Sequence, residues 1–313
     1  MPIENIILRD PSSGSVAEIA PSRGFNCHRF AVVRGGKPIE VLWSEPTFLE
    51  GTAKPSRSGV PILFPFPGRL PGKTLAWKGN QYELGTDDGR GNAIHGFVHT
   101  RPWRVISQSE NRVVGEFHAW RDDPSLKNRW PADFRIRATY ELTGSTLTMG
   151  YLMENPGDAP LPCGLGTHPY FRVPLAGSSA DDCVVQLPVT TQWELIEMIP
   201  TGRQLPLPNA AELMAGKKFA ELTLDNCFAG LQFKGDWCAA VIEDPQSGVR
   251  MTIRFDRAFR ECVVYTPPHR QAICIEPYTC VPGAAAMQDP AAAGLRILSP
   301  AEALEAKVQF ELA

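Results

Sequence analysis

The sequence has no excess of either charge and no long apolar run. Lys and Arg together number 31 and Asp and Glu 34, which leaves a net charge of −3. Nucleic-acid-binding proteins usually carry a strongly basic surface, and a membrane-spanning helix needs about eighteen or more consecutive apolar residues. The first residues also lack the charged-then-apolar pattern of a signal peptide. We therefore expect a cytoplasmic protein with no nucleic-acid and no membrane partner.

Motifs for metals, nucleotides and nucleophilic serines are missing as well. None of the eight cysteines forms a C-x-x-C pair, so we expect reduced, mostly buried thiols rather than a zinc ribbon or a disulfide framework. The sequence contains neither a phosphate-binding glycine pattern after a strand nor a G-x-S-x-G turn. His95 and His99 are four residues apart, but Gly96 follows His95 where the zinc motif H-E-x-x-H needs a glutamate. We expect no metal and no cofactor.

Helix signals are scarce, whereas proline is abundant. The chain has 29 prolines in 313 residues, about 9% against an average of about 5%, and a helix interior does not tolerate proline. A helical bundle and a coiled coil are therefore excluded. Three segments remain as short helix candidates, namely 209–220, with Asn209 as a cap and Gly216 as an interruption, 282–286, and 299–302.

Alternating apolar and polar residues instead predict many strands. These are 112–120, 138–142, 147–153, 249–255, 262–266, 272–276 and 306–312. Strands without intervening helices indicate an all-β antiparallel sandwich or barrel, and the 43% hydrophobic content supports a sizeable core. No linker or fixed-period repeat divides the chain, so we expect residues 1–313 to form a single domain.

Two of the six histidines stand in unusual local sequences. His95 lies in Gly91-Asn92-Ala93-Ile94-His95-Gly96-Phe97, where the glycines favour a tight turn or a close backbone approach. His168 lies in Gly164-Leu165-Gly166-Thr167-His168-Pro169-Tyr170-Phe171, beside two aromatic rings on which a sugar can stack. Each histidine fits either a functional site or a turn with satisfied polar groups. His99 is equally open, whereas His28, His118 and His269 are expected to be structural or at the surface.

Three charged residues complete the set of candidates. Glu276 ends an apolar run just before Pro277, where burial would raise its pKa toward that of a general base; the alternative is a carboxylate that caps turn amides. Asp225 would bind a ligand hydroxyl or form an Asx turn, and Arg69 would clamp a ligand or serve as an ion-pair partner. The acidic pairs Asp87-Asp88 and Asp122-Asp123 are expected to lie in solvated turns.

Five blocks that contain these residues, taken together and in this order, resemble the aldose 1-epimerase (mutarotase) superfamily. The blocks are 61–70 around Arg69, 92–97 around His95, 166–171 around His168, 224–228 around Asp225 and 275–284 around Glu276. The resemblance covers about the whole chain. It implies an antiparallel β-supersandwich, like that of galactose mutarotase, with a few short helices and an open cleft.

The resemblance also implies a reaction, the interconversion of the α- and β-anomers of a hexose. Glu276 would take the proton of the C1 hydroxyl and His168 would protonate the ring oxygen, from opposite sides of a small cleft. His95 would assist near the ring oxygen, while Arg69 and Asp225 would hold sugar hydroxyls. The protein would then be an isomerase of carbohydrate metabolism, with a small sugar as its partner and a monomeric or homodimeric state.

The chain departs from many galactose mutarotases at Gly68 and Arg172, where asparagines are common, and at Pro277-Tyr278-Thr279, where a glutamine-containing stretch is usual. These differences leave the sugar open. One alternative is a hexose-6-phosphate 1-epimerase of the same fold, for which Arg90, Arg101, Arg172 and Arg203 are candidate phosphate ligands. Others are a non-catalytic sugar-binding or regulatory protein and, with less support, a lyase or hydrolase on a related sandwich.

Overall fold

The computed structural model describes residues 4–313. Of the chain, 46% is strand and 11% is helix, and the strands form antiparallel sheets, which confirms the predicted all-β class. No helix among residues 4–313 is long and apolar enough to cross a bilayer.

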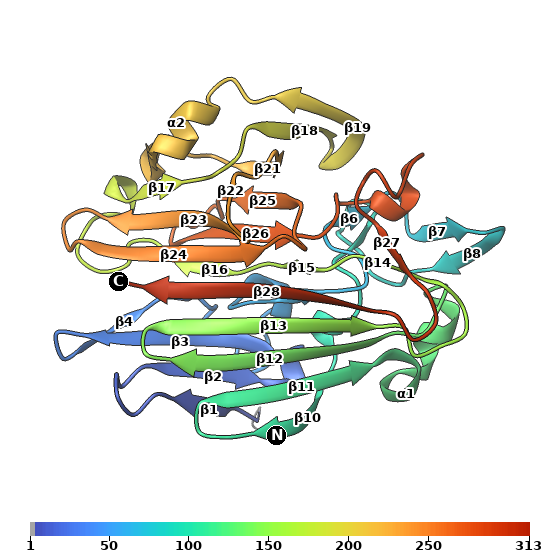
Figure 1. Ribbon diagram of the computed structural model, residues 1–313, viewed down its shortest axis with the longest axis horizontal. Coiled ribbons are helices and arrows are strands. Elements are labelled where there is room, and N and C mark those ends of the chain that lie inside the picture. The colour runs from blue at the N-terminus through green and yellow to red at the C-terminus, as the bar shows by residue number, and fades with distance from the viewer. Residues whose placement is uncertain (1–3) are drawn as a thin grey trace.

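The largest sheet has ten strands. In spatial order they are β10 (Arg104–Gln108), β11 (Arg112–His118), β12 (Arg135–Thr143), β13 (Thr146–Glu154), β28 (Ala303–Leu312), β24 (Val249–Asp256), β23 (Trp237–Asp244), β17 (Val184–Gln186) and β20 (Lys217–Lys218), with β22 (Phe233–Lys234) paired to β23. Figure 1 shows β28, the last strand of the chain, between β13 and β24. Along β13 every second side chain is buried, which is the pattern expected of a strand with one face against a core.

A second sheet of eight strands carries the segments singled out in the sequence. Its order is β19 (Ile199–Pro206), β18 (Thr191–Ile196), β21 (Asp225–Ala229), β25 (Glu261–Tyr265), β26 (Ala272–Tyr278), β15 (Gly166–Thr167) and β5 (Ile62–Leu63), with β16 (Tyr170–Arg172) also paired to β26. The rings of Phe171 on β16 and Phe310 on β28 meet edge to face, with centroids 4.7 Å apart. This contact joins the two large sheets in one hydrophobic core.

Smaller sheets flank these two. They are a four-stranded sheet of β1 (Ile6–Arg9), β2 (Val16–Ala20), β3 (Asn26–Arg34) and β4 (Lys37–Glu40), and the pairs β14 (Leu161–Cys163) with β27 (Arg296–Leu298), β6 (Arg69–Leu70) with β9 (Ala93–Ile94), and β7 (Thr74–Trp77) with β8 (Asn80–Glu83). The pair β6–β9 matters for function because its first strand begins at Arg69 and its second ends next to His95.

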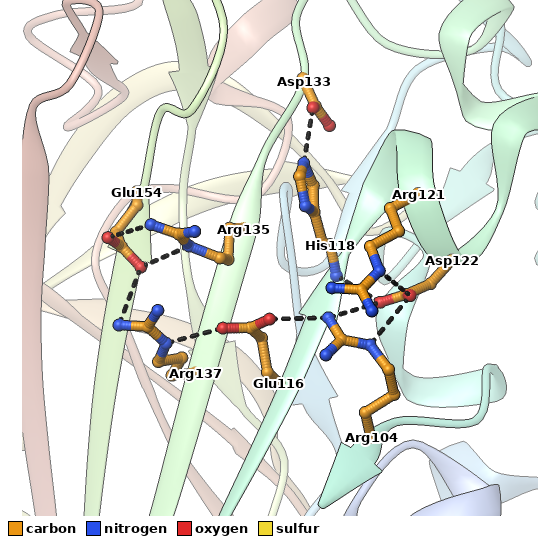
Figure 2. A network of polar contacts seen from close by, with 9 residues as sticks. All are labelled: Arg104, Glu116, His118, Arg121, Asp122, Asp133, Arg135, Arg137 and Glu154. Carbon is orange, nitrogen blue, oxygen red and sulfur yellow. Dashed lines mark hydrogen bonds and ion pairs between the residues drawn. The ribbon is translucent and has the colours of Figure 1, made fainter. Parts of the chain in front are cut away.

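One face of the ten-stranded sheet is held by a network of ion pairs (Figure 2). Glu116 on β11 bridges Arg104 on β10 and Arg137 on β12, with N–O distances of 2.6 and 2.7 Å. The network continues to Glu154 on β13, which Arg135 contacts at 2.7 Å. Cross-strand pairs of opposite charge stabilise neighbouring strands, so these side chains tie β10 to β13 in register.

The helices are shorter than predicted. The candidate 209–220 yields α2 (Ala210–Ala215), which ends because Gly216 adopts φ = 113°, and Asn209 occupies the cap position without a side-chain cap bond. Segment 282–286 yields a single 3-10 turn at Ala284–Ala286. Segment 299–302 forms a turn and no helix, since Ala301 has φ = 63°.

The remaining helical elements are short. They are α1 (Ala119–Asp122) and the 3-10 turns Pro21–Arg23, Pro55–Arg57, Val98–Thr100, Pro124–Asn128, Ala180–Asp182 and Phe219–Glu221. The predicted strand 112–120 therefore ends at His118, and Ala119 and Trp120 belong to α1.

Candidate active site

The five residues singled out in the sequence line one open cleft. This cleft has a volume of about 1060 Å³, and its wall includes Arg69, His95, His168, Asp225 and Glu276. They come from five separate segments, so the fold brings together residues more than two hundred positions apart. The chemistry available in the cleft depends on the strand or loop that holds each of these side chains.

Glu276 is held on β26, and the strand does not end there as predicted. It continues through Pro277 to Tyr278, and Pro277 pairs with Cys262 on β25; the neighbouring strand on the other side is interrupted between β15 and β16. A proline, which has no N–H group to donate, is tolerated where a ladder is broken. Glu276 is only 1% exposed, and it shares one face of the strand with Tyr278, two residues on.

His168 lies in that interruption. Gly166 pairs with Tyr278 and Tyr170 pairs with Cys274, so continuing this register places His168 directly opposite Glu276. The two side chains therefore point to the same face, and Nε2 of His168 lies 3.4 Å from Oε1 of Glu276. The ring of Tyr170 stacks parallel to the imidazole, with centroids 4.9 Å apart and an angle of 2°, which fixes its plane.

Burial shifts the pKa values of Glu276 and His168 in opposite directions. It raises the pKa of Glu276 well above its ordinary value, since an ionised carboxylate is poorly solvated there. It lowers the pKa of His168 to about 3 for the same reason. The carboxylate thus gains affinity for a proton while the imidazolium becomes a stronger acid. The raised pKa moves Glu276 toward the range of a general base at neutral pH, whereas the lowered pKa leaves the His168 imidazole uncharged there.

Tyr278 controls the carboxylate from the other side. Its hydroxyl donates a hydrogen bond of 2.8 Å to Oε2 of Glu276, which stabilises the ionised form and opposes the pKa rise caused by burial. Nothing in the sequence marked Tyr278 beyond a departure from the family pattern. Its position two residues from Glu276 on one strand becomes informative only when the strand is known to extend that far.

Arg69 and His95 are set side by side by β6 and β9. Arg69 pairs with Ile94 in the ladder, and the amide of His95 donates to the carbonyl of Gly68 at 2.8 Å. His95 itself adopts φ = 63°, a conformation that is rare outside glycine and often occurs at functional sites. Its ring meets that of His168 edge to face, with centroids 5.5 Å apart.

Two glycines make this arrangement possible. Gly96 has φ = 64°, and a Cβ atom there would lie 2.2 Å from the carbonyl oxygen of Phe64. Gly68 has φ = 67°, and a Cβ atom would lie 2.7 Å from the side chain of Pro282. The departure from asparagine at Gly68 thus accompanies a close approach of the two chain segments.

Asp88 is a component of the site that the sequence did not reveal. It was expected in a solvated turn, but its side chain is 1% exposed and its Oδ2 lies 3.1 Å from Nε of Arg69. Burial opposes its ionisation, whereas hydrogen bonds from the side chain and amide of Asn92 and the amide of Arg90 outweigh that effect and hold the pKa at about 2. Asp88 is therefore a charged anchor for Arg69.

Asp225 begins β21, which lies in the same sheet as β26, and pairs with Tyr265 on the intervening strand β25. Its side chain is exposed and accessible to a ligand. The cleft is also lined by His99, which the sequence left open, by His269, which was expected to be structural or at the surface, and by Trp43. Trp43 stacks on His269 with centroids 4.3 Å apart. These contacts join distant segments, which the sequence alone could not pair.

The four arginines considered as phosphate ligands do not converge. Arg90 and Arg101 line the cleft, but Arg101 is bound to Asp123 at 2.6 Å. Arg172 donates to the carbonyl of Leu42, and Arg203 pairs with Glu194 on the β18–β19 hairpin. Other cations, Lys54 and Arg57, lie at the cleft with Arg90 and are exposed.

Comparisons with known proteins find relatives in sequence and in fold. The aldose 1-epimerase family profile matches residues 31–311. The chain is 27% identical over 228 residues to the uncharacterized protein YphB of Escherichia coli K12, covering 68% of this chain and 69% of YphB. It is 24% identical over 226 residues to the uncharacterized protein YihR of the same organism, covering 71% of this chain and 70% of YihR.

Solved structures share the fold. A galactose mutarotase-like protein from Clostridium acetobutylicum superposes with a TM-score of 0.86 at 21% identity, covering 100% of this chain and 99% of that one. Galactose 1-epimerase from Lactobacillus acidophilus superposes with a TM-score of 0.73 at 18% identity, covering 99% of each chain. The predicted supersandwich is thereby confirmed.

Proposed function

Because the chain belongs to the aldose 1-epimerase family, we propose that it is an isomerase that interconverts the α- and β-anomers of an aldohexose by acid–base catalysis. The observation that carries the proposal is the buried pair of His168 and Glu276, 3.4 Å apart at the wall of a sugar-sized cleft. A protein that only binds sugar has no need of such a pair.

Anomer exchange requires two proton transfers at neighbouring oxygens. Glu276 takes the proton of the C1 hydroxyl while His168 gives one to the ring oxygen, the ring opens, the C1–C2 bond rotates, and the ring closes with the two roles exchanged. Both oxygens are bonded to C1, so the acid and the base must lie close together. The side-by-side placement of the two residues suits this better than the opposite walls expected from the sequence.

The other residues hold the sugar. Arg69, fixed by Asp88, and Asp225 bind hydroxyl groups, and His95 contacts the region of the ring oxygen beside His168. Each positioned proton transfer contributes roughly 10²–10⁴ in rate, which is ample for a reaction that already proceeds slowly in water.

The proposal is tested with freshly dissolved anomers. Polarimetry or NMR exchange follows α-to-β conversion of galactose and glucose with the purified protein and with buffer alone; galactose comes first because a structural neighbour is named galactose 1-epimerase. We expect concentration-dependent acceleration. Binding of these sugars with no rate above buffer would instead assign a non-catalytic binding protein.

A phosphorylated sugar is the second candidate, favoured by Lys54, Arg57 and Arg90 at the cleft. These three side chains form no ion pair with another residue in the described part of the chain, 4–313. Comparing kcat/KM for glucose and galactose with that for their 6-phosphates separates the two candidates. A higher value for a 6-phosphate, lost in an Arg57→Ala and Arg90→Ala double variant, would establish the phosphosugar.

A further inference from the structure

A buried cysteine thiol lies beside the acid–base pair. Cys274 precedes Glu276 by two residues on β26, so both side chains lie on the same face of the strand. The Sγ of Cys274, a carboxylate oxygen of Glu276 and an imidazole nitrogen of His168 all lie within 4.8 Å of one another. All three side chains are buried, Cys274 completely.

Thiolate, imidazole and carboxylate are the donor groups that proteins use for Zn²⁺. With metal–ligand bonds of 2.0–2.3 Å, two donors on a tetrahedral ion lie roughly 3.4 Å apart, and the nitrogen–oxygen distance between His168 and Glu276 is 3.4 Å. Only the sulfur of Cys274 has to move closer to the other two donor atoms for all three to bind one ion. Three protein donors also leave one coordination position open on the cleft side, the pattern of an accessible zinc site.

The His168 imidazole makes no side-chain hydrogen bond within residues 4–313. Nδ1 of His168 is buried and has no hydrogen-bond partner among the described residues, which is uncommon for a buried polar atom. Nε2 has Glu276 as its neighbour at 3.4 Å, longer than a normal hydrogen bond. The negative charges of Glu276 and Asp225 favour cation binding between His168, Cys274 and Glu276, whereas the positive charge of Arg69 disfavours it.

We propose that His168, Cys274 and Glu276 form an inhibitory site for a thiophilic divalent cation of the zinc type. The cation binds as the thiol proton, and any proton on Glu276, passes to solvent; no electrons are transferred. A bound ion occupies the lone pairs that the acid–base reaction needs, so turnover stops until the ion is removed. The inhibitory consequence rests on the proposed function, whereas the binding itself does not.

Binding is tested without reference to activity, by titration with Co²⁺. A cobalt–thiolate bond gives a near-ultraviolet charge-transfer band that other donors do not give. The matched control is Cys227→Ser, which changes a buried thiol on β21 at the wall of the cleft that lies outside the donor group. We expect the band in the unmodified protein and in the control and its loss in Cys274→Ser. An unchanged band in Cys274→Ser, or no band in the unmodified protein, would overturn the site.

The activity arm measures inhibition by Zn²⁺ and recovery with a chelator. Cys274→Ser is expected to retain basal turnover and to need at least about tenfold more Zn²⁺ for half inhibition, equivalent to about 1.4 kcal/mol of binding. Cys274→Ala replaces it if the serine variant fails to fold. Equal sensitivity of either variant would refute inhibition through this thiol. Cobalt binding without any basal turnover would refute the proposed function and leave the metal site standing.

Discussion

Nε2 of His168 lies 3.4 Å from Oε1 of Glu276 because the two residues are opposite each other across an interrupted pair of strands. Gly166 pairs with Tyr278 and Tyr170 with Cys274, so one register continues across the break and brings the imidazole to the carboxylate.

Replacing His168 by asparagine should remove the proton donor while leaving a polar side chain of similar reach. We expect kcat to fall roughly 10²–10⁴-fold with little change in KM. The matched control is His118→Asn, since His118 binds Asp133 outside the cleft (Figure 2) and should affect turnover little. An equal loss in both variants would indicate general structural damage rather than a role for His168.

Tyr278→Phe tests the control of the carboxylate. Loss of the hydroxyl removes a hydrogen bond that favours ionised Glu276, so the pKa of Glu276, already raised by burial, rises further. Because the base must be ionised, the acidic limb of the kcat/KM profile should move to higher pH, by about one unit for about 1.4 kcal/mol. Tyr265→Phe, which makes no hydrogen bond to Glu276 within residues 4–313, should leave the limb in place. A profile that shifts in neither variant would exclude this role.

Removing the Glu276 charge should stabilise the fold. A carboxyl group whose pKa is raised in the folded state makes folding less favourable as pH rises from its unfolded pKa through its folded pKa. Glu276→Gln should therefore raise Tm, and more at pH 8 than at pH 5. Differential scanning calorimetry at the two pH values measures the difference.

A second glutamate provides the control of opposite sign. Arg137 and Arg104 outweigh burial and lower the pKa of Glu116, so this carboxylate contributes stability above its unfolded pKa that is lost as pH falls. Glu116→Gln should lower Tm at pH 8. If Glu276→Gln also lowered Tm at pH 8, the interpretation of Glu276 as a costly buried charge would be wrong.

Asp88→Asn tests whether the anchored arginine binds substrate. The variant keeps the size of the side chain but loses its charge opposite Arg69. We expect KM to rise about tenfold, which corresponds to about 1.4 kcal/mol, with a smaller change in kcat. Asp87→Asn is the neighbouring control, because the exposed pair of Asp87 and Lys73 is worth little. Initial rates over a range of sugar concentrations distinguish the two parameters, and an unchanged KM in Asp88→Asn would contradict the role given to Arg69.

Much of the fold could be predicted from the sequence, because a strand with one buried face has an apolar side chain at every second residue. The alternation in 147–153 and 306–312 predicted β13 and β28 within a few positions. Short helices were less predictable, since Gly216 and Ala301 adopt positive φ values that end or prevent a helix. The single domain and the oligomeric state stay predictions.

The site was predictable as a set of residues but not as a geometry. Arg69, His95, His168, Asp225 and Glu276 stood out by their motifs, and all five line one cleft. Their distances depend on strand register across distant segments, which no local pattern encodes. Asp88 and Tyr278 were missed for the same reason. Asp88 acts on Arg69 and Tyr278 on Glu276, and only the folded chain brings these partners together.

Glu276 is the proposed base of the anomer-exchange reaction. Glu276→Gln keeps the shape of the side chain and its capacity to accept the hydrogen bond of Tyr278, but it cannot take a proton. In polarimetry with a fresh anomer, we expect kcat to fall by roughly 10²–10⁴ with KM little changed, in a variant that calorimetry shows to be folded. Turnover equal to that of the unmodified enzyme would contradict it.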